Sequence, residues 1–490
     1  MARRKEYDVI VVGGGPGGVT CAAFLAKCGL KTLLIEKNER VGGKMITLSK
    51  KGFTYQLSAM NLAPLKGHGV EVAFKELGIE SELKTIPAKT SVSFYRGRSG
   101  KWNKVARVFG QEEDPTALFQ QWELDDTELG QAVAVLAELV TMPPEKIDLL
   151  DDITFDELLA RYEIPAPLYS QFGQIANNMC INLTDLACAG EAVRMFQDAT
   201  RIGMDGCGYS VGGLGRLYEV LGNTVEAKGG EVLTRTRVES ITVSDDRVTG
   251  VATKQGEFKA PIVVSNAGIQ PTVLKLVGEQ HFDRSYVSYV KDLVPGMGFI
   301  GGRYFLSRPV LQDNLYSVYS DTAWLNLERY LKIKEGQQPR DVVIFATVTS
   351  NFDPTAAPPG KQMLLMGSLC SPYPDEKEMK AVTSAAEQTM FEIFPELESA
   401  IEDREYLGPH DVSSISRDHV LPNQGGEAEG LARVPGQSGS RKPSAKSPLR
   451  GMFYTGGDTA GGTGVGSNEA VHSGMNVARM VFRYFKMRQV

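Results

Sequence analysis

The sequence predicts an α/β fold in which one α/β domain, split into three stretches of chain, carries an inserted α+β domain. Three observations support this prediction. A short apolar strand, a glycine-rich turn and a helix open the chain within residues 8–27, the order of a βαβ unit. A helix, a hairpin and a buried strand follow one another over residues 212–267. A second glycine-rich run, residues 456–466, leads directly into an amphipathic C-terminal helix.

Composition limits the class of protein. The chain has 490 residues, of which 42% are hydrophobic, enough for more than one core. Its net charge of −6 gives no overall attraction to nucleic acid. The six cysteines form no CxxC pair, which predicts reduced thiols in a cytoplasmic protein. We find no signal peptide and no apolar run of membrane-spanning length. The basic end of the last helix leaves open a solvated face or a peripheral membrane contact, through Arg479, Arg483, Lys486 and Arg488.

The first glycine-rich segment has the pattern of a dinucleotide site. Residues 9–12 form a short buried strand, and Gly13, Gly15 and Gly18 then fill the three positions of G-x-G-x-x-G. The first glycine allows the tight turn, the second lets the backbone approach a pyrophosphate, and the third lets the helix pack on the strand. The free N–H groups at the start of the helix point at the phosphates. The segment therefore predicts a Rossmann-like unit.

A carboxylate at the end of the next strand strengthens this prediction. Residues 31–35 form the second strand, and Glu36 follows it, placed for the ribose hydroxyls of an adenosine. A lone G-x-G-x-x-G is weak evidence, but here strand, helix and acid stand in the expected order. The motif alone does not separate NAD from FAD.

The continuation resembles the extended dinucleotide-binding motif of flavoproteins in the amine oxidase and phytoene desaturase superfamily. Arg40, Gly42 and Gly43 carry this resemblance. It implies FAD as the cofactor, with the arginine and the paired glycines against the pyrophosphate and ribityl chain, since a guanidinium suits a phosphate in charge and shape. Lys37 and Lys44 stand beside these positions and are predicted to bind the cofactor with them.

Two later segments resemble the same superfamily. In the middle of the chain, the resemblance implies that the backbone of Val238 meets the adenine. Near the C-terminus, it implies that Asp458 bonds the ribityl or pyrophosphate region. Gly464 and Val465 precede a helix that begins near Gly466, and its positive end would stabilise negative charge around N1 of the reduced flavin.

The remaining stretches are assigned to a substrate domain. We predict an FAD-binding domain of residues 1–75, 205–290 and 425–490, and a substrate domain of residues 76–204, largely helical, and 291–424. A second G-x-G-x-x-G, residues 296–301, is followed by a strand-like run, so we predict a glycine-rich strand or bend there. Without a separate NAD(P)H domain, a diffusible electron acceptor is expected. Residues 425–451 are polar and basic, which predicts a surface loop.

The catalytic residues are not evident from the sequence. Relatives commonly read G-F-x-x-D-x-G beside the flavin, whereas this chain has Gln56 and Ser58 at the Asp and second Gly positions, with Met60 still expected near the cofactor. Histidines are more often structural or exposed than catalytic, and buried aromatic residues are more often core than pocket lining. The weak candidates of these two kinds are His410, His419, His472, Tyr304, Tyr316, Tyr319 and Trp324.

The resemblance implies an FAD-dependent oxidoreductase of the phytoene desaturase-like group. It would act on C–C bonds of a hydrophobic isoprenoid, polyene or alicyclic substrate by hydride transfer to or from flavin N5. Two alternatives remain open at this point. One is amine oxidase-like C–N oxidation, which an aromatic cage would favour. The other is a prenyl- or lipid-binding protein of the GDP-dissociation-inhibitor type, which has no flavin chemistry.

Overall fold

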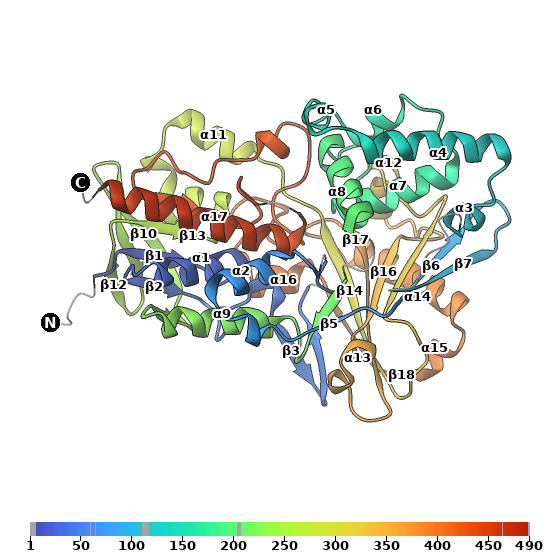
Figure 1. The fold of residues 1–490 in the computed structure, drawn as a ribbon, viewed down its shortest axis with the longest axis horizontal. Helices are drawn as coiled ribbons and strands as arrows, with labels where there is room; N and C mark the ends of the chain where they lie inside the picture. The colour runs from blue at the N-terminus through green and yellow to red at the C-terminus, as the bar shows by residue number, and fades with distance from the viewer. Residues whose placement is uncertain are drawn as a thin grey trace.

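The computed structural model describes residues 6–58, 60–63, 65–109, 117–202, 207–462 and 464–488. Figure 1 shows two lobes side by side, each built around its own sheet. Both lobes draw on stretches of chain that lie far apart in the sequence.

A five-stranded parallel sheet forms the first lobe. Its strands stand in the order β19 (Met452–Tyr454), β13 (Val263–Ser265), β1 (Val9–Val12), β2 (Thr32–Ile35) and β9 (Glu231–Leu233). Helix α1 (Pro16–Lys27) packs against both α9 (Gly215–Ala227) and α17 (Gly466–Met487), which lie on either side of it in Figure 1. The carboxyl ends of parallel strands share one edge, where α/β folds bind ligands. The Rossmann-like fold predicted from the sequence is confirmed.

A seven-stranded mixed sheet forms the second lobe. Its order is β18 (Ile401–Leu407), β14 (Gly298–Leu306), β17 (Gln362–Cys370), β16 (Ile344–Val348), β15 (Leu315–Ser320), β6 (Thr90–Arg96) and β7 (Trp102–Val108). Helices α7 (Ala166–Asn178) and α14 (Glu376–Ile393) pack on it. The second G-x-G-x-x-G lies at the start of β14, so the predicted strand is confirmed. The domain boundaries predicted from the sequence fall between the strands of the two sheets and stay a prediction.

Smaller sheets and further helices complete the fold. A three-stranded antiparallel sheet contains β10 (Val238–Ser244), β11 (Arg247–Thr253) and β12 (Gly256–Lys259), and two short pairs join β3 (Thr47–Lys50) to β4 (Phe53–Gln56) and β5 (Thr85–Pro87) to β8 (Gly208–Ser210). The other helices are α2 (Gly69–Leu77), α3 (Ala117–Gln121), α4 (Asp126–Thr141), α5 (Pro144–Asp148), α6 (Phe155–Leu159), α8 (Ala189–Ile202), α10 (Ile269–Pro271), α11 (Arg284–Asp292), α12 (Leu327–Lys334), α13 (Thr349–Phe352), α15 (Glu396–Ala400) and α16 (Pro409–Ile415).

Two predictions about these stretches are wrong. The first is wrong only in part: residues 117–202 are largely helical, as predicted, but residues 85–108 contain three strands that the prediction missed. The predicted surface loop of residues 425–451 is instead a packed segment, in which Glu427 and Ser438 are fully buried and Arg433 is only 4% exposed. The polar composition of this segment predicted exposure to solvent. Its charged side chains are instead paired inside the protein, because a buried charge needs a partner.

Two observations bear on the predicted contact with a membrane. In the part of the chain that the structure describes, no helix combines the length and the apolar character needed to cross a membrane. At the basic end of α17, Arg479 forms an ion pair with Glu76, and Arg488 donates a hydrogen bond to the Pro261 carbonyl. Part of the basic face is therefore occupied by contacts within the protein.

Candidate active site

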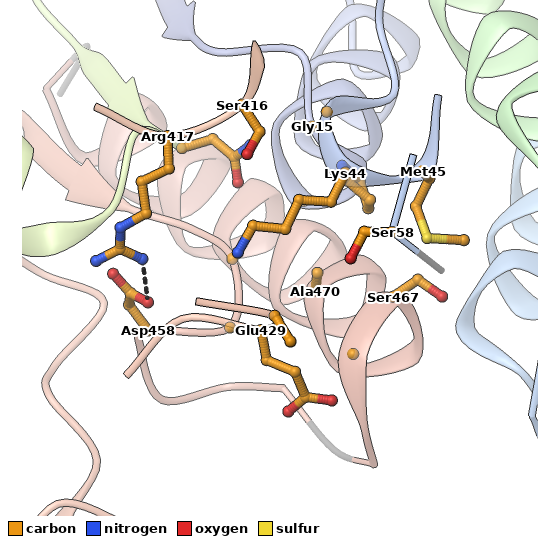
Figure 2. A pocket seen from close by; sticks show the side chains of 18 of the residues that line it. Gly15, Lys44, Met45, Ser58, Ser416, Arg417, Glu429, Asp458, Ser467 and Ala470 are labelled. Carbon is orange, nitrogen blue, oxygen red and sulfur yellow. Dashed lines mark hydrogen bonds and ion pairs between the residues drawn. The ribbon is translucent and has the colours of Figure 1, made fainter. Parts of the chain in front are cut away.

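A cavity of about 1030 Å³ lies at the carboxyl edge of the parallel sheet and extends into the second lobe. Figure 2 shows some of the side chains that line it. Of the residues predicted to bind the cofactor, the lining includes Gly13, Gly15, Glu36, Lys37, Gly43, Lys44, Met60, Val238, Asp458, Gly464 and Val465. Gly18, Arg40 and Gly42 are not in the lining.

The glycines of the first motif leave a cradle that side chains would fill. Gly13 has a φ of +93°, and Gly15 caps α1 without any side-chain hydrogen bond. A Cβ on Gly15 would lie 2.7 Å from the amide nitrogen of Asn266. One on Gly18 would lie only 2.0 Å from the Gly13 carbonyl oxygen, so Gly18 serves helix–strand packing. The open N–H groups of α1 therefore face a space suited to phosphates.

Glu36 is fixed in the orientation that a ribose would need. It is 4% exposed, and its two oxygens accept hydrogen bonds from the N–H groups of Gly14 (2.7 Å) and Asn38 (2.8 Å). Each carboxylate oxygen can accept a further bond, so hydroxyl groups can still reach them. Next to it, Lys37 forms a 3.0 Å ion pair with Asp418, which also binds Arg237.

The structure brings Lys44 to the cavity but not Arg40. The Arg40 guanidinium is 44% exposed and binds the Glu39 carboxylate at 3.0 Å. The reason is the turn between them, because Gly42 and Gly43 both have positive φ and redirect the chain so that Lys44 points inward. Figure 2 shows its side chain reaching toward the Arg417–Asp458 pair. Burial lowers the pKa of Lys44 to about 8, and the nearby Arg417 adds to this effect.

We expect Lys44→Met to weaken FAD binding about 10- to 100-fold, the usual effect of losing a charge-assisted hydrogen bond to a phosphate. Arg40→Met, the matched control, should leave the affinity unchanged. The wild-type affinity should also fall as pH rises from 7 to 9, because Lys44 loses its proton near pH 8 in the free protein. Titration of deflavinated protein with FAD measures both effects. Equal losses in the two variants would contradict the placement of Lys44.

Asp458 lines the cavity, but its oxygens already have partners. One oxygen accepts from Arg417 at 3.0 Å and from the Leu431 N–H at 3.1 Å, and the other accepts from the Ile269 N–H at 3.0 Å. Burial would raise the pKa of Asp458, but Arg417 and these hydrogen bonds outweigh it and hold the pKa below its usual range. Asp458 therefore positions Arg417, a lining cation that sequence reasoning missed because it stands outside every motif.

The second glycine-rich run opens the start of α17 to the cavity. Gly464 has a φ of +86°, and Val465 caps the helix without a side-chain hydrogen bond. Gly466, Ser467 and Asn468, in the first turn, all line the cavity. The positive end of a 22-residue helix therefore faces this space.

A buried charge network anchors this helix end to the second lobe. Arg433 binds Glu469 of α17 (2.9 Å), Glu429 (2.8 Å) and Glu191 of α8 (3.0 Å), and Lys442 also pairs with Glu469. Sequence reasoning gave Glu469 no role and missed the other members. They are brought together only by the tertiary fold, so no spacing pattern could have revealed them.

Of the weaker candidates for catalytic residues, one histidine lines the cavity and the others do not. His472 lines the cavity, and burial lowers its pKa, with a contribution from Arg479. His410 and His419 instead pack against the ring of Tyr373. The four aromatic candidates are outside the cavity lining, in the core or packed against it: Tyr304, Tyr316, Tyr319 and Trp324.

The part of the cavity away from the glycine cradle is largely apolar. The second lobe and the segment after β4 contribute Met60, Met179, Ile181, Met195, Phe299 and Phe345 to its lining, beside the polar Asn61, Lys66, Asn178 and Asp198. No tyrosine or tryptophan occurs among the described lining residues. One cavity thus joins a backbone cradle for phosphates to a chamber suited to a hydrophobic molecule.

Comparisons with known proteins agree with this geometry. A family model described as "Flavin containing amine oxidoreductase" matches residues 16–482. The chain is 23% identical over 449 residues to prolycopene isomerase of Daucus carota, covering 82% of this chain and 69% of that protein. It is 22% identical over 531 residues to all-trans-retinol 13,14-reductase of Danio rerio, covering 93% and 83%. A crystal structure of an oxidoreductase from Methanosarcina mazei has a TM-score of 0.72 at 16% identity, covering 96% and 99%, and supports the fold.

The family match begins within the first glycine-rich segment, at residue 16, and runs through the middle segment that contributes Val238 and through the second glycine-rich run. A cavity with helix N-termini at two places and a fixed carboxylate at Glu36 fits the phosphates and ribose of FAD. FAD is therefore the cofactor, and the activity is that of an oxidoreductase. This chain belongs to the flavin containing amine oxidoreductase family.

Proposed function

We propose that this oxidoreductase transfers hydride between FAD and a C–C bond of a hydrophobic isoprenoid, polyene or alicyclic substrate. The observation that carries the proposal is the apolar chamber, which continues the same cavity as the glycine cradle. The names of two relatives, a prolycopene isomerase and an all-trans-retinol reductase, support a polyene or isoprenoid. We further propose that a diffusible electron acceptor or donor completes the cycle.

The chamber disfavours amine oxidation. A cationic or amine substrate is best held by the faces of tryptophan and tyrosine, and neither residue occurs among the described lining residues. Methionine is flexible and polarisable, so Met60, Met179 and Met195 can adapt to a long apolar molecule.

When bound, FAD supplies the hydride chemistry at its N5 atom, and the protein supplies orientation, electrostatics and exclusion of water. The start of α17 stabilises negative charge on the cofactor through its open N–H groups. Lys44 and Arg417 would neutralise phosphate charge, and Glu36 would orient the ribose.

The test is a set of anaerobic reactions in which the visible absorption of the bound flavin reports its reduction or reoxidation. Phytoene, 13,14-dihydroretinol, cyclohexanecarboxylate and putrescine are added to the oxidised holoenzyme, and all-trans-retinol is added to the photoreduced holoenzyme. We expect an isoprenoid to bleach the oxidised flavin or all-trans-retinol to reoxidise the reduced flavin. Bleaching by putrescine alone would overturn the C–C assignment. A purified protein without flavin absorption would instead favour the lipid-binding alternative.

A further inference from the structure

The buried network around Arg433 contains one carboxylate oxygen that has no partner among the residues that the structure describes. Both oxygens of Glu469 are taken, by Lys442 and by Arg433. Both oxygens of Glu191 are also taken, by the Gly439 N–H and by Arg433. Glu429 uses only Oε2, which accepts from Arg433 at 2.8 and 3.2 Å. Among the described residues, none donates a hydrogen bond to its Oε1.

This oxygen lies where the reaction is expected. Glu429 lines the cavity, whereas Glu191 and Glu469 do not. A Cβ on Gly466, the first residue of α17, would lie 3.3 Å from Glu429 Oε1. Figure 2 shows Glu429 on the same side of the cavity as Ser467 and Ala470, in the first turns of α17. The free oxygen therefore adjoins the helix end assigned to the flavin ring.

The network holds Glu429 in place but leaves one of its oxygens open. Glu191 and Glu469 each pair with a second cation beside Arg433, namely Arg194 at 3.5 Å and Lys442, whereas among the described residues Glu429 pairs with Arg433 alone. Arg433 fixes Glu429 through one oxygen only, which orients the carboxylate without blocking the other oxygen. A general base needs this combination of a fixed position and a free lone pair.

We infer that Glu429 is the proton-transferring catalytic residue of this site, an inference that rests on the proposed function. In dehydrogenation, one C–H bond breaks and its hydride goes to FAD. The adjacent C–H bond also breaks, its electron pair forms the second C–C bond, and its proton passes to Oε1 of Glu429. In the reverse direction, protonated Glu429 donates this proton to carbon while the hydride returns from the reduced cofactor.

The first arm of the test needs no substrate. We expect Glu429→Gln to raise the midpoint potential of the bound flavin, because removal of a nearby negative charge favours the reduced, anionic cofactor. Glu191→Gln is the matched control, since it removes a carboxylate from the same guanidinium without touching the cavity. Its potential should stay closer to that of the wild type. Equal potentials in Glu429→Gln and wild type would overturn the inference, whatever the substrate is.

The second arm uses the compound that bleaches or reoxidises the flavin in the panel above. Glu429→Gln should slow this hydride-transfer step about 10²- to 10⁴-fold, leave KM nearly unchanged, and remove the pH-dependent limb of the rate profile. Glu191→Gln should keep the rate and the limb. A wild-type rate and pH profile in Glu429→Gln would show that Glu429 is only structural. If no compound of the panel reacts with the wild type, the proposed function fails, while the potentials still decide whether Glu429 adjoins the flavin.

Discussion

Replacing Gly18 with alanine is expected to yield a protein that holds little flavin and unfolds more easily. The added Cβ would lie 2.0 Å from the Gly13 carbonyl oxygen and 3.0 Å from Cβ of Asn266. The first of these contacts is with backbone, so α1 must move away from β1. Such overpacking costs roughly 1–3 kcal/mol and sometimes more. The shift also displaces the N–H groups at Gly15 that form the phosphate cradle.

Gly130→Ala is the matched control for this substitution. Gly130 is exposed in the middle of α4, has no neighbour within 4 Å of an added Cβ, and lies outside the cavity. Alanine there should stabilise the protein by about 0.5–1 kcal/mol, the difference between the two residues in a helix. Flavin absorbance per polypeptide and denaturant unfolding measure both variants. Full flavin content in Gly18→Ala would contradict the role assigned to close helix–strand packing.

The first βαβ unit could be predicted because its constraints are local. Gly13, Gly15 and Gly18 are demanded by one turn and one helix contact, and Glu36 follows the next strand directly. The strand-like run after the second G-x-G-x-x-G likewise indicated β14. Strands β6 and β7 were not predicted. The alternation of buried and exposed side chains along them can be recognised only when the neighbouring strands are known. The packed segment 425–451 was missed because composition records charges and not their pairing.

In the site, too, local features could be predicted from the sequence, whereas features that depend on long-range contacts could not. The spacing of residues after Glu36 could predict that cationic side chains follow it, but not which of them faces the cavity. Arg40 points outward and Lys44 inward because Gly42 and Gly43, both with positive φ, turn the chain between them. Arg417 and Glu429 reach the cavity from stretches that carry no motif. Their positions depend on contacts between residues far apart in sequence, such as the Arg417–Asp458 and Arg433–Glu191 pairs. A single sequence contains no signal for such pairs.

Replacing Arg433 with methionine is expected to destabilise the protein strongly, because Arg433 is a buried cation with three carboxylate partners. Arg433 is 4% exposed and is bound by three carboxylates. Burial alone would lower its pKa, but Glu429 and Glu191 raise it above the usual value. Methionine fills similar space but removes the cation that pairs with Glu429, and it leaves Glu469 with Lys442 and Glu191 with Arg194. Removing one partner of a buried ion pair typically costs 3–5 kcal/mol. Flavin should be lost in addition, because Glu469 no longer fixes the start of α17.

Arg441→Met provides the comparison, since Arg441 lies in the same segment and also forms an ion pair, with Asp152. Both of these side chains are more than half exposed, so solvent already screens their attraction and the free energy of unfolding should hardly change. Denaturant unfolding of the two holoenzymes gives the difference, and the slope against denaturant shows whether unfolding remains a single transition. The lobes are joined through Glu191 on α8, so Arg433→Met should also broaden or split that transition. Similar small losses in both variants would mean that the buried network neither anchors α17 nor couples the two lobes.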